Sequence, residues 1–151
     1  MKTVLNNRIL AAVILFTSVL LVSSCTSSRK TIAIEEGWEL LGESKVDFIK
    51  DKDRVDVLSS NRFTALRFKV EGRGIRLNDL EVVYQNGDKL SPVIDEEIAA
   101  DLYSRDIELG PEGKSLRSVD FKYRTTGNLL KGRGNVLLFG KKYVAPVNYN
   151  Q

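Results

Sequence analysis

The sequence predicts an all-β domain, an antiparallel β-sandwich of jelly-roll-like form with about eight or nine strands and at most one short helix. Three observations lead to this fold class. Apolar and polar residues alternate with period two in many short segments, which is typical of strands with one buried and one wet face. Asn86-Gly87 marks a tight hairpin, because these residues accept the positive φ angles of a type I′ turn. Glycines punctuate most of the remaining segments.

Before the domain, the chain begins with the features of a secretory signal peptide. An apolar run over residues 9–22 follows the basic residues Lys2 and Arg8. As a helix this run of 14 residues extends roughly 21 Å, which is short of the roughly 30 Å hydrocarbon core of a bilayer. A charged start, a short apolar run and the small residues Ser23 and Ser24 together predict an exported chain.

Cys25 is the only cysteine and follows the small residues directly. The stretch "VSSC" resembles a bacterial lipobox, in which a lipid is attached to the cysteine sulfur and cleavage leaves that cysteine first. We therefore expect cleavage between Ser24 and Cys25 and a stable membrane anchor, because two or more acyl chains hold a protein firmly. One cysteine cannot form a disulfide within the chain. The alternatives are an ordinary signal peptide and an uncleaved membrane anchor.

This cleavage would divide the chain into parts with different roles. The parts are a signal peptide (1–24), a lipidated tether (25–36), a β-sandwich domain (37–141) and a C-terminal tail (142–151). Removing 24 of the 151 residues leaves 127, the size of one domain. Loss of Lys2 and Arg8 from the 23 basic residues leaves 21 against 20 acidic ones. Such a balance gives no electrostatic case for nucleic acid, and we expect no nucleic-acid partner.

Alternation predicts the strands of the domain in chain order. In "TALRFKVEG", Leu66, Phe68 and Val70 share one face, and Arg67 and Lys69 share the other. The segments "DRVDVLS", "NDLEVVYQNGD" and "SVDFKYR" alternate in the same way. The expected strands are 37–42, 45–50, 54–59, 64–71, 75–85, 88–94, 104–109, 116–125 and 134–140.

One segment is a helical candidate. In "IDEEIAADLY", Ile94, Ile98 and Leu102 recur every four residues, and the acidic run 95–97 suits a helix N-terminus. The segment is short, so it predicts either a single helical turn or no helix.

Several segments in order resemble a known family. They are "WELLGESKVDF", "DRVDV", "FTALRFKV", "YQNGDKL", "SRDIEL", "LRSVDFKYR" and "GNVLLFG". Together they are similar to the bacterial exported domain of unknown function 2541, from about Trp38 to Gly140. The stretch "GPEGKS" before Leu116 departs from the pattern, as an insertion would. The resemblance implies a small secreted or periplasmic β-sandwich and no agreed activity.

The residue types leave little room for catalysis. The chain has no histidine, which excludes a Ser-His-Asp triad, a Cys-His pair and a histidine-ligated metal. In "DKDRVD", Asp51, Asp53 and Asp56 offer oxygen ligands, but Val55 occupies a ligand position of the calcium loop and the turn glycine is absent. Adjacent carboxylates such as those of residues 95–97 seldom flank a sugar. We expect no catalytic residue, no metal site and no cofactor.

Aromatic and arginine side chains are the remaining candidates for binding. Trp38, Tyr84 and Tyr123 are in phase with apolar neighbours and should be core residues. Tyr103 is the best candidate for an exposed ring. It precedes Arg105, and like Arg117 this arginine belongs to a strand segment of the family-like block. A bidentate arginine there either locks two strands, which we favour, or grips an acidic ligand.

We therefore expect a lipid-anchored protein of the bacterial envelope, a non-enzymatic binding or structural module. Its partners would be the membrane, through Cys25, and an envelope protein or glycan. The residue after the cysteine is Thr26 and not an aspartate. The resemblance to known sorting preferences therefore implies the outer membrane, facing the periplasm.

The first alternative is a carbohydrate- or cell-wall-glycan-binding domain, which needs an exposed aromatic pair. The second is a small carboxylate- or calcium-dependent hydrolase, which needs a pocket with convergent carboxylates.

Overall fold

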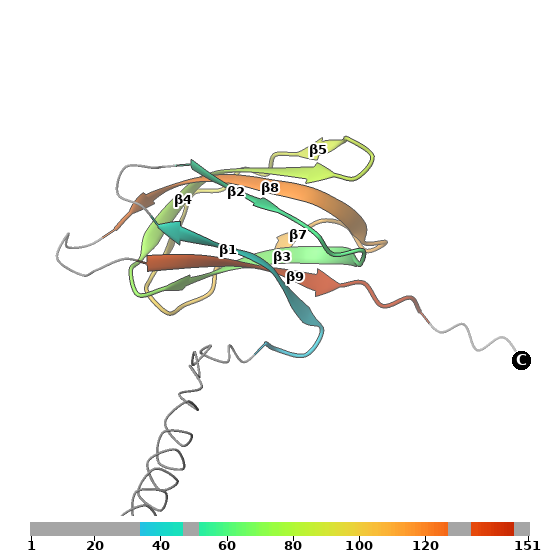
Figure 1. The fold of residues 1–151 in the computed structure, drawn as a ribbon, viewed down its shortest axis with the longest axis horizontal. Coiled ribbons are helices and arrows are strands. Elements are labelled where there is room, and N and C mark those ends of the chain that lie inside the picture. The colour runs from blue at the N-terminus through green and yellow to red at the C-terminus, as the bar shows by residue number, and fades with distance from the viewer. Residues whose placement is uncertain (1–33, 47–51, 127–133, 147–151) are drawn as a thin grey trace, which may run out of the picture. The chain divides into compact units, whose positions relative to one another are not determined.

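The structure, a computed structural model, describes residues 34–46, 52–126 and 134–146, which belong to one compact unit (Figure 1). The strands are β1 (Trp38–Val46), β2 (Lys52–Asp56), β3 (Arg62–Glu71), β4 (Ile75–Tyr84), β5 (Lys89–Leu90), β6 (Glu96–Ile98), β7 (Ile107–Glu108), β8 (Lys114–Thr125) and β9 (Gly134–Lys142). All pairings among them are antiparallel. The predicted all-β, antiparallel fold class is confirmed.

The strands lie in two layers joined at one corner, as Figure 1 shows. We call the layer of β1, β9, β3 and β7 the lower layer, and the layer of β2, β8, β4, β5 and β6 the upper layer. The layers join where the first residues of β3 pair with those of β8, Arg62 with Ser115 and Phe63 with Lys114. One open sheet therefore folds over itself, and the result is the sandwich that the alternation predicts.

The core fills the space between the layers with the apolar side of each alternating strand. Phe68 of β3 meets Phe121 of β8 edge to face, with ring centroids 5.1 Å apart. Tyr123 is buried beside Phe121, and its hydroxyl donates a hydrogen bond to Asp53 Oδ2 at 2.7 Å. Tyr84 packs against the same cluster from the side. The prediction that Tyr123 belongs to the core is therefore confirmed, whereas Tyr84 is only partly buried at the edge of the core.

Several strand boundaries differ from the prediction. The expected strand 54–59 is β2, which runs from Lys52 to Asp56, and the expected strand 104–109 is reduced to the two residues of β7. The expected strands 37–42 and 45–50 form one strand, β1, with a bulge between Leu40 and Gly42; residues 47–50 lie outside the described part. The expected strand 88–94 is shorter, because only Lys89 and Leu90 pair with β4 and Pro92 follows. A proline has no N–H to give to a ladder, which explains why pairing ends there.

The helical candidate does not form a helix. Residues Glu96–Ile98 form β6, which pairs with β4, and Asp101 adopts a φ of 66° in the following turn. Ile94 and Ile98 point into the core, whereas Leu102 is 58% exposed. The hydrogen bonds offered by β4 outweigh the four-residue spacing. In the described part of the chain, no helix is long and apolar enough to cross a bilayer.

Candidate functional site

The outer face of the lower layer carries apolar side chains that the alternating pattern does not predict. Val136 and Leu138 of β9 point into the core, as expected. Leu137 and Phe139 lie between them in sequence and point the other way, yet each is only 1% exposed. β9 is thus buried on both faces, although none of the described strands forms a third layer above its outward side.

Side chains of the neighbouring strands cover this outward side. Trp38 of β1 lies opposite Lys141 of β9, Arg67 of β3 lies opposite Phe139, and Tyr103 bridges to Lys69 of β3. Diagonal neighbours in a sheet are close enough for long side chains to touch. The Arg67 guanidinium lies between two rings, with its Cζ 4.0 Å from the Trp38 centroid and 4.3 Å from the Tyr103 centroid.

Two lysines complete the cluster. Lys69 Nζ lies 5.5 Å from the Tyr103 centroid, and Lys141 Nζ lies 5.9 Å from the Trp38 centroid. The Tyr103 ring also leans on Phe139, with centroids 6.0 Å apart. We call the group of Trp38, Arg67, Lys69, Tyr103 and Lys141 the cationic–aromatic face. Cations held over aromatic faces are attracted by the negative ring centre, most strongly where water is excluded.

Charge on this face is partly balanced. Arg67 Nη2 donates a hydrogen bond to Glu35 Oε2 at 2.7 Å, and Lys69 pairs with Glu71 at 3.4 Å. The Arg67 side chain is only 11% exposed, and its buried Nε finds no hydrogen-bond acceptor among the described residues. A guanidinium can be buried between two rings with one N–H unpaired because it is flat and weakly hydrated. A lysine ammonium is strongly hydrated and is not suited to this position.

The outer face of the upper layer is built differently. Its outward side chains form ion pairs. Two of them join neighbouring strands, Lys122 with Asp79 at 2.9 Å and Lys89 with Glu81 at 3.0 Å. In the third, Arg76 of β4 pairs at 2.6 Å with Asp95, which directly precedes β6. The hydrogen bond from Lys122 lowers the pKa of Asp79, and that from Arg76 lowers the pKa of Asp95. These carboxylates are held ionised, whereas a general acid needs a raised pKa.

A shallow depression of about 270 Å³ lies on the same outer face. Its lining residues are Lys52, Asp79, Glu81, Ser91, Asp120, Phe121 and Lys122. Three carboxylates therefore line one hollow, which is the feature that the hydrolase alternative needs. Each of them faces a cation, since Asp120 lies 3.8 Å from Arg54 and the other two pair with lysines.

A second hollow, of about 360 Å³, lies at the end of the sandwich beside the β4–β5 turn. It is lined by Arg62, Tyr84, Gln85, Asn86, Asp88, Gly113, Lys114 and Ser115. Gly87 in the turn has a φ of 91°, but Asn86 does not have a positive φ. The hairpin forms where it is predicted, but its turn is not of the predicted type I′, which needs a positive φ at both residues. Burial raises the pKa of the Tyr84 phenol. We call this hollow the end hollow.

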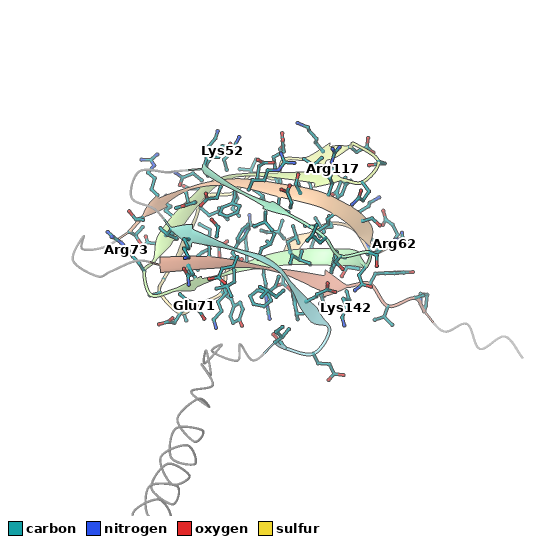
Figure 2. The ribbon with its side chains drawn as sticks, in the orientation of Figure 1. Lys52, Arg62, Glu71, Arg73, Arg117 and Lys142 are labelled. Atoms are coloured by element: carbon teal, nitrogen blue, oxygen red, sulfur yellow. The ribbon has the colours of Figure 1, made fainter. Side chains whose placement is uncertain are left out.

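The residues singled out from the sequence lie in different places. Tyr103 is 39% exposed and belongs to the cationic–aromatic face. Arg105 ties two loops together, because its Nη2 donates to the Val93 carbonyl at 3.1 Å and its backbone N–H donates to Glu96 Oε1 at 2.8 Å. Arg117 is exposed on β8 in the upper layer (Figure 2), so it does not join Tyr103.

Two members of the cationic–aromatic face lie in surroundings that differ from the prediction. Trp38 is buried, at 7% exposure, but it lies on the outer side of the lower layer and not between the layers. Alternation predicts that Arg67 lies on a wet face, but its side chain is only 11% exposed, and its stacking between two rings has no sequence signature. One signal was available: the unbroken apolar run 136–139 indicates a strand that is covered on both sides.

Some of the predicted positions cannot be placed. Ser24, Cys25 and Asp51 lie outside the described residues. Within the described ranges, no group of three or more acidic, cysteine or histidine side chains is arranged to hold a metal ion.

Comparisons with known proteins place the chain in a family without a known activity. One solved structure, from the work "Structural and functional characterization of Pseudomonas aeruginosa AlgX", aligns with a TM-score of 0.40 at 14% identity. The alignment covers 70% of this chain and 27% of that one, and a likeness at this level carries no functional argument. No curated protein matches the sequence. The family model described as "Domain of unknown function (DUF2541)" matches residues 12–140, and the chain therefore belongs to that family.

Proposed function

We propose that this protein is a lipid-anchored, non-enzymatic binding module of the bacterial envelope, attached through Cys25 to the outer membrane and facing the periplasm. The observation that carries the proposal is the cationic–aromatic face. Trp38 and Tyr103 hold Arg67 between them beside the point where the chain enters β1. Arginine, tryptophan and tyrosine are the side chains that most often dominate binding surfaces.

The charge arrangement supports binding over catalysis. Each carboxylate that lines the upper depression faces a basic side chain, as does the Asp95 carboxylate with Arg76. Salt bridges of this kind suit a solvated surface. The chain also has no histidine to serve as a base near neutral pH. The lipobox-like "VSSC" supports the anchor.

The test of the anchor is Cys25→Ala in the full chain, with Ser27→Ala as a matched control two residues downstream. We expect the control to be cleaved, acylated and found in the membrane fraction, and the Cys25→Ala chain to be neither cleaved nor acylated. Intact-mass measurement of the purified chain reads both events. A wild-type chain with a free thiol and no bound lipid would contradict the proposal.

Binding is tested in the same cells by cross-linking and affinity capture of envelope partners. We expect Arg67→Ala to lose the captured partner and Arg54→Ala, on the upper layer, to keep it. Circular dichroism of both variants shows whether the fold is intact. Equal capture by the two variants would show that the cationic–aromatic face is not the contact surface.

The end hollow favours a second candidate, the binding of a cell-wall glycan. Its lining combines the Tyr84 ring with planar amide and carboxylate side chains of Gln85, Asn86 and Asp88. Sugars are recognised by such rings and polar planes together. Titration calorimetry with soluble peptidoglycan fragments tests this candidate. Asn86→Ala should weaken binding and Asn61→Ala, away from the hollow, should not; absence of heat with the wild-type chain would refute it.

A further inference from the structure

We infer that the cationic–aromatic face rests on the phospholipid headgroups of the membrane that carries the anchor. This inference rests on the proposed lipid at Cys25 and names the partner of that face. Its three grounds are the place where the tether joins the domain, the chemistry of the face, and the contrast with the upper layer.

The tether reaches the domain at this face. Glu35, the second described residue, pairs with Arg67 at 2.7 Å, and its carbonyl accepts a hydrogen bond from the Trp38 N–H at 3.0 Å. Figure 1 shows that the chain enters β1 on the side of the lower layer that faces away from the upper layer. Nine residue steps from Cys25 to Ile34 span at most about 32 Å, so a lipid on Cys25 holds this face near the bilayer.

The side chains suit a headgroup layer. Tryptophan and tyrosine concentrate at membrane–water interfaces, where one part of the ring is wet and the other is not. Tyr103 is 39% exposed, and it follows Leu102, which is 58% exposed. Ile34, at the end of the tether, is 47% exposed. Exposed apolar side chains that can contact the lipid are therefore present at the end of the tether and next to the Tyr103 ring.

The cations can meet lipid phosphates. Basic residues near an anionic membrane surface are each attracted to it. Glu35 and Glu71 neutralise Arg67 and Lys69 in part, and within the described part of the chain Lys141 contacts the Trp38 ring and no carboxylate. Farther along β1, Glu43 and Lys45 carry opposite charges. The face is therefore weakly cationic as a whole and most cationic around its two rings.

The outer face of the upper layer is less suited to contact with phospholipid headgroups. Its outward carboxylates, those of Asp79, Glu81 and Asp95 among them, are 39% to 59% exposed and would approach the phosphates together with the lysines. Repulsion of these carboxylates by the phosphates offsets the attraction of the bases.

Trp38 is the only tryptophan and reports on docking directly. The lipidated full chain is reconstituted into vesicles of phosphatidylethanolamine and phosphatidylglycerol that contain a headgroup nitroxide lipid. We expect the nitroxide to quench Trp38 emission. In the double variant Trp38→Phe, Val83→Trp, which moves the tryptophan to the outer face of β4, we expect little quenching.

Charge variants sharpen the test. Lys69→Gln together with Lys141→Gln should lower the ratio of docked to undocked domain about fivefold for each lysine removed. The matched pair Lys52→Gln and Lys89→Gln, on the upper layer, should leave the quenching unchanged. Quenching that falls equally in both pairs would show a response to bulk charge, and it would overturn the inference.

Failure of this inference is distinguishable from failure of the anchor. If the nitroxide does not quench Trp38 emission in a chain whose mass shows an acylated Cys25, membrane docking is overturned and the lipid anchor is still supported. A bare Cys25 in the wild-type chain overturns both.

Discussion

The two outer faces of the sandwich begin from the same sequence pattern and end as different surfaces. In "TALRFKV" of β3 and "SVDFKYR" of β8, charged residues alternate with apolar ones. On β8 and its neighbours the charged residues find opposite charges, as Lys122 does with Asp79. On β3 the residue Arg67 instead lies flat between two rings and covers buried apolar side chains. An alternating pattern thus shows which side chains point outward and does not show what they meet there.

The neighbouring strand makes the difference. β9 brings Leu137 and Phe139 to the outer face of the lower layer, where neighbouring side chains bury both of them. Among the described strands, the upper layer contains no strand of this kind, since the outward residues of β4 beside β8 include Asp79 and Glu81. Arg67 can cover an apolar surface because its stem and planar head are both compatible with packing on rings.

The largest expected difference between the faces concerns Phe139. Phe139→Ala should lower the free energy of unfolding by about 3–5 kcal/mol, because it leaves a cavity under a face that is nominally the outside. Lys89→Ala on the upper layer should cost about 1 kcal/mol or less. Urea unfolding of both variants measures this. Similar, small losses would show that the outer side of β9 is not a packed surface.

The next effect concerns Arg67 itself. Arg67→Lys keeps the charge and loses the flat, weakly hydrated head, so we expect a loss of about 1–2 kcal/mol in the free energy of unfolding. Arg54→Lys, on the upper layer, should leave the stability unchanged. Thermal or urea unfolding followed by Trp38 fluorescence reports on both. Should Arg54→Lys prove the more harmful, the contrast between the faces would be reversed.

The smallest effect is expected from acid. Ion pairs lower the pKa of Asp79, Asp95 and Glu112, the last through its hydrogen bond from Lys114. A carboxyl whose folded pKa is lowered adds stability above its unfolded pKa, about 4, and loses it as the pH falls through the folded pKa. Stability should therefore decline below about pH 4, and Asp95→Asn should make the decline shallower.

Denaturant unfolding at a series of pH values checks this, and added salt should weaken the same ion pairs because they are exposed. The stacking on the lower layer should respond little to either change, since neither a guanidinium nor a ring titrates in acid. A decline that Asp95→Asn leaves untouched would mean that other carboxyls control the acid limit.

Local pattern was enough for much of the fold. The period-two strands 64–71, 75–85 and 116–125 correspond to β3, β4 and β8, and the expected closing strand 134–140 corresponds to β9. The Asn86-Gly87 turn lies where it is predicted, although it is not of type I′. These predictions succeeded because each depends on residues adjacent in the chain. The segment 94–103 was harder, because its helical spacing competed with hydrogen bonds from β4, which is distant from it in sequence.

The sequence by itself determined the β fold class, the hairpin, most of the residues that face the core, and the scarcity of catalytic side chains, because alternation, turn chemistry and composition are local properties. Only the tertiary structure decided that Trp38, Arg67 and Tyr103 meet. These residues come from three distant segments. Strand order and register bring Trp38 and Arg67 together across β9 and place Tyr103 beside β3. Register follows from the packing of the whole core, so no single segment of the chain contains it.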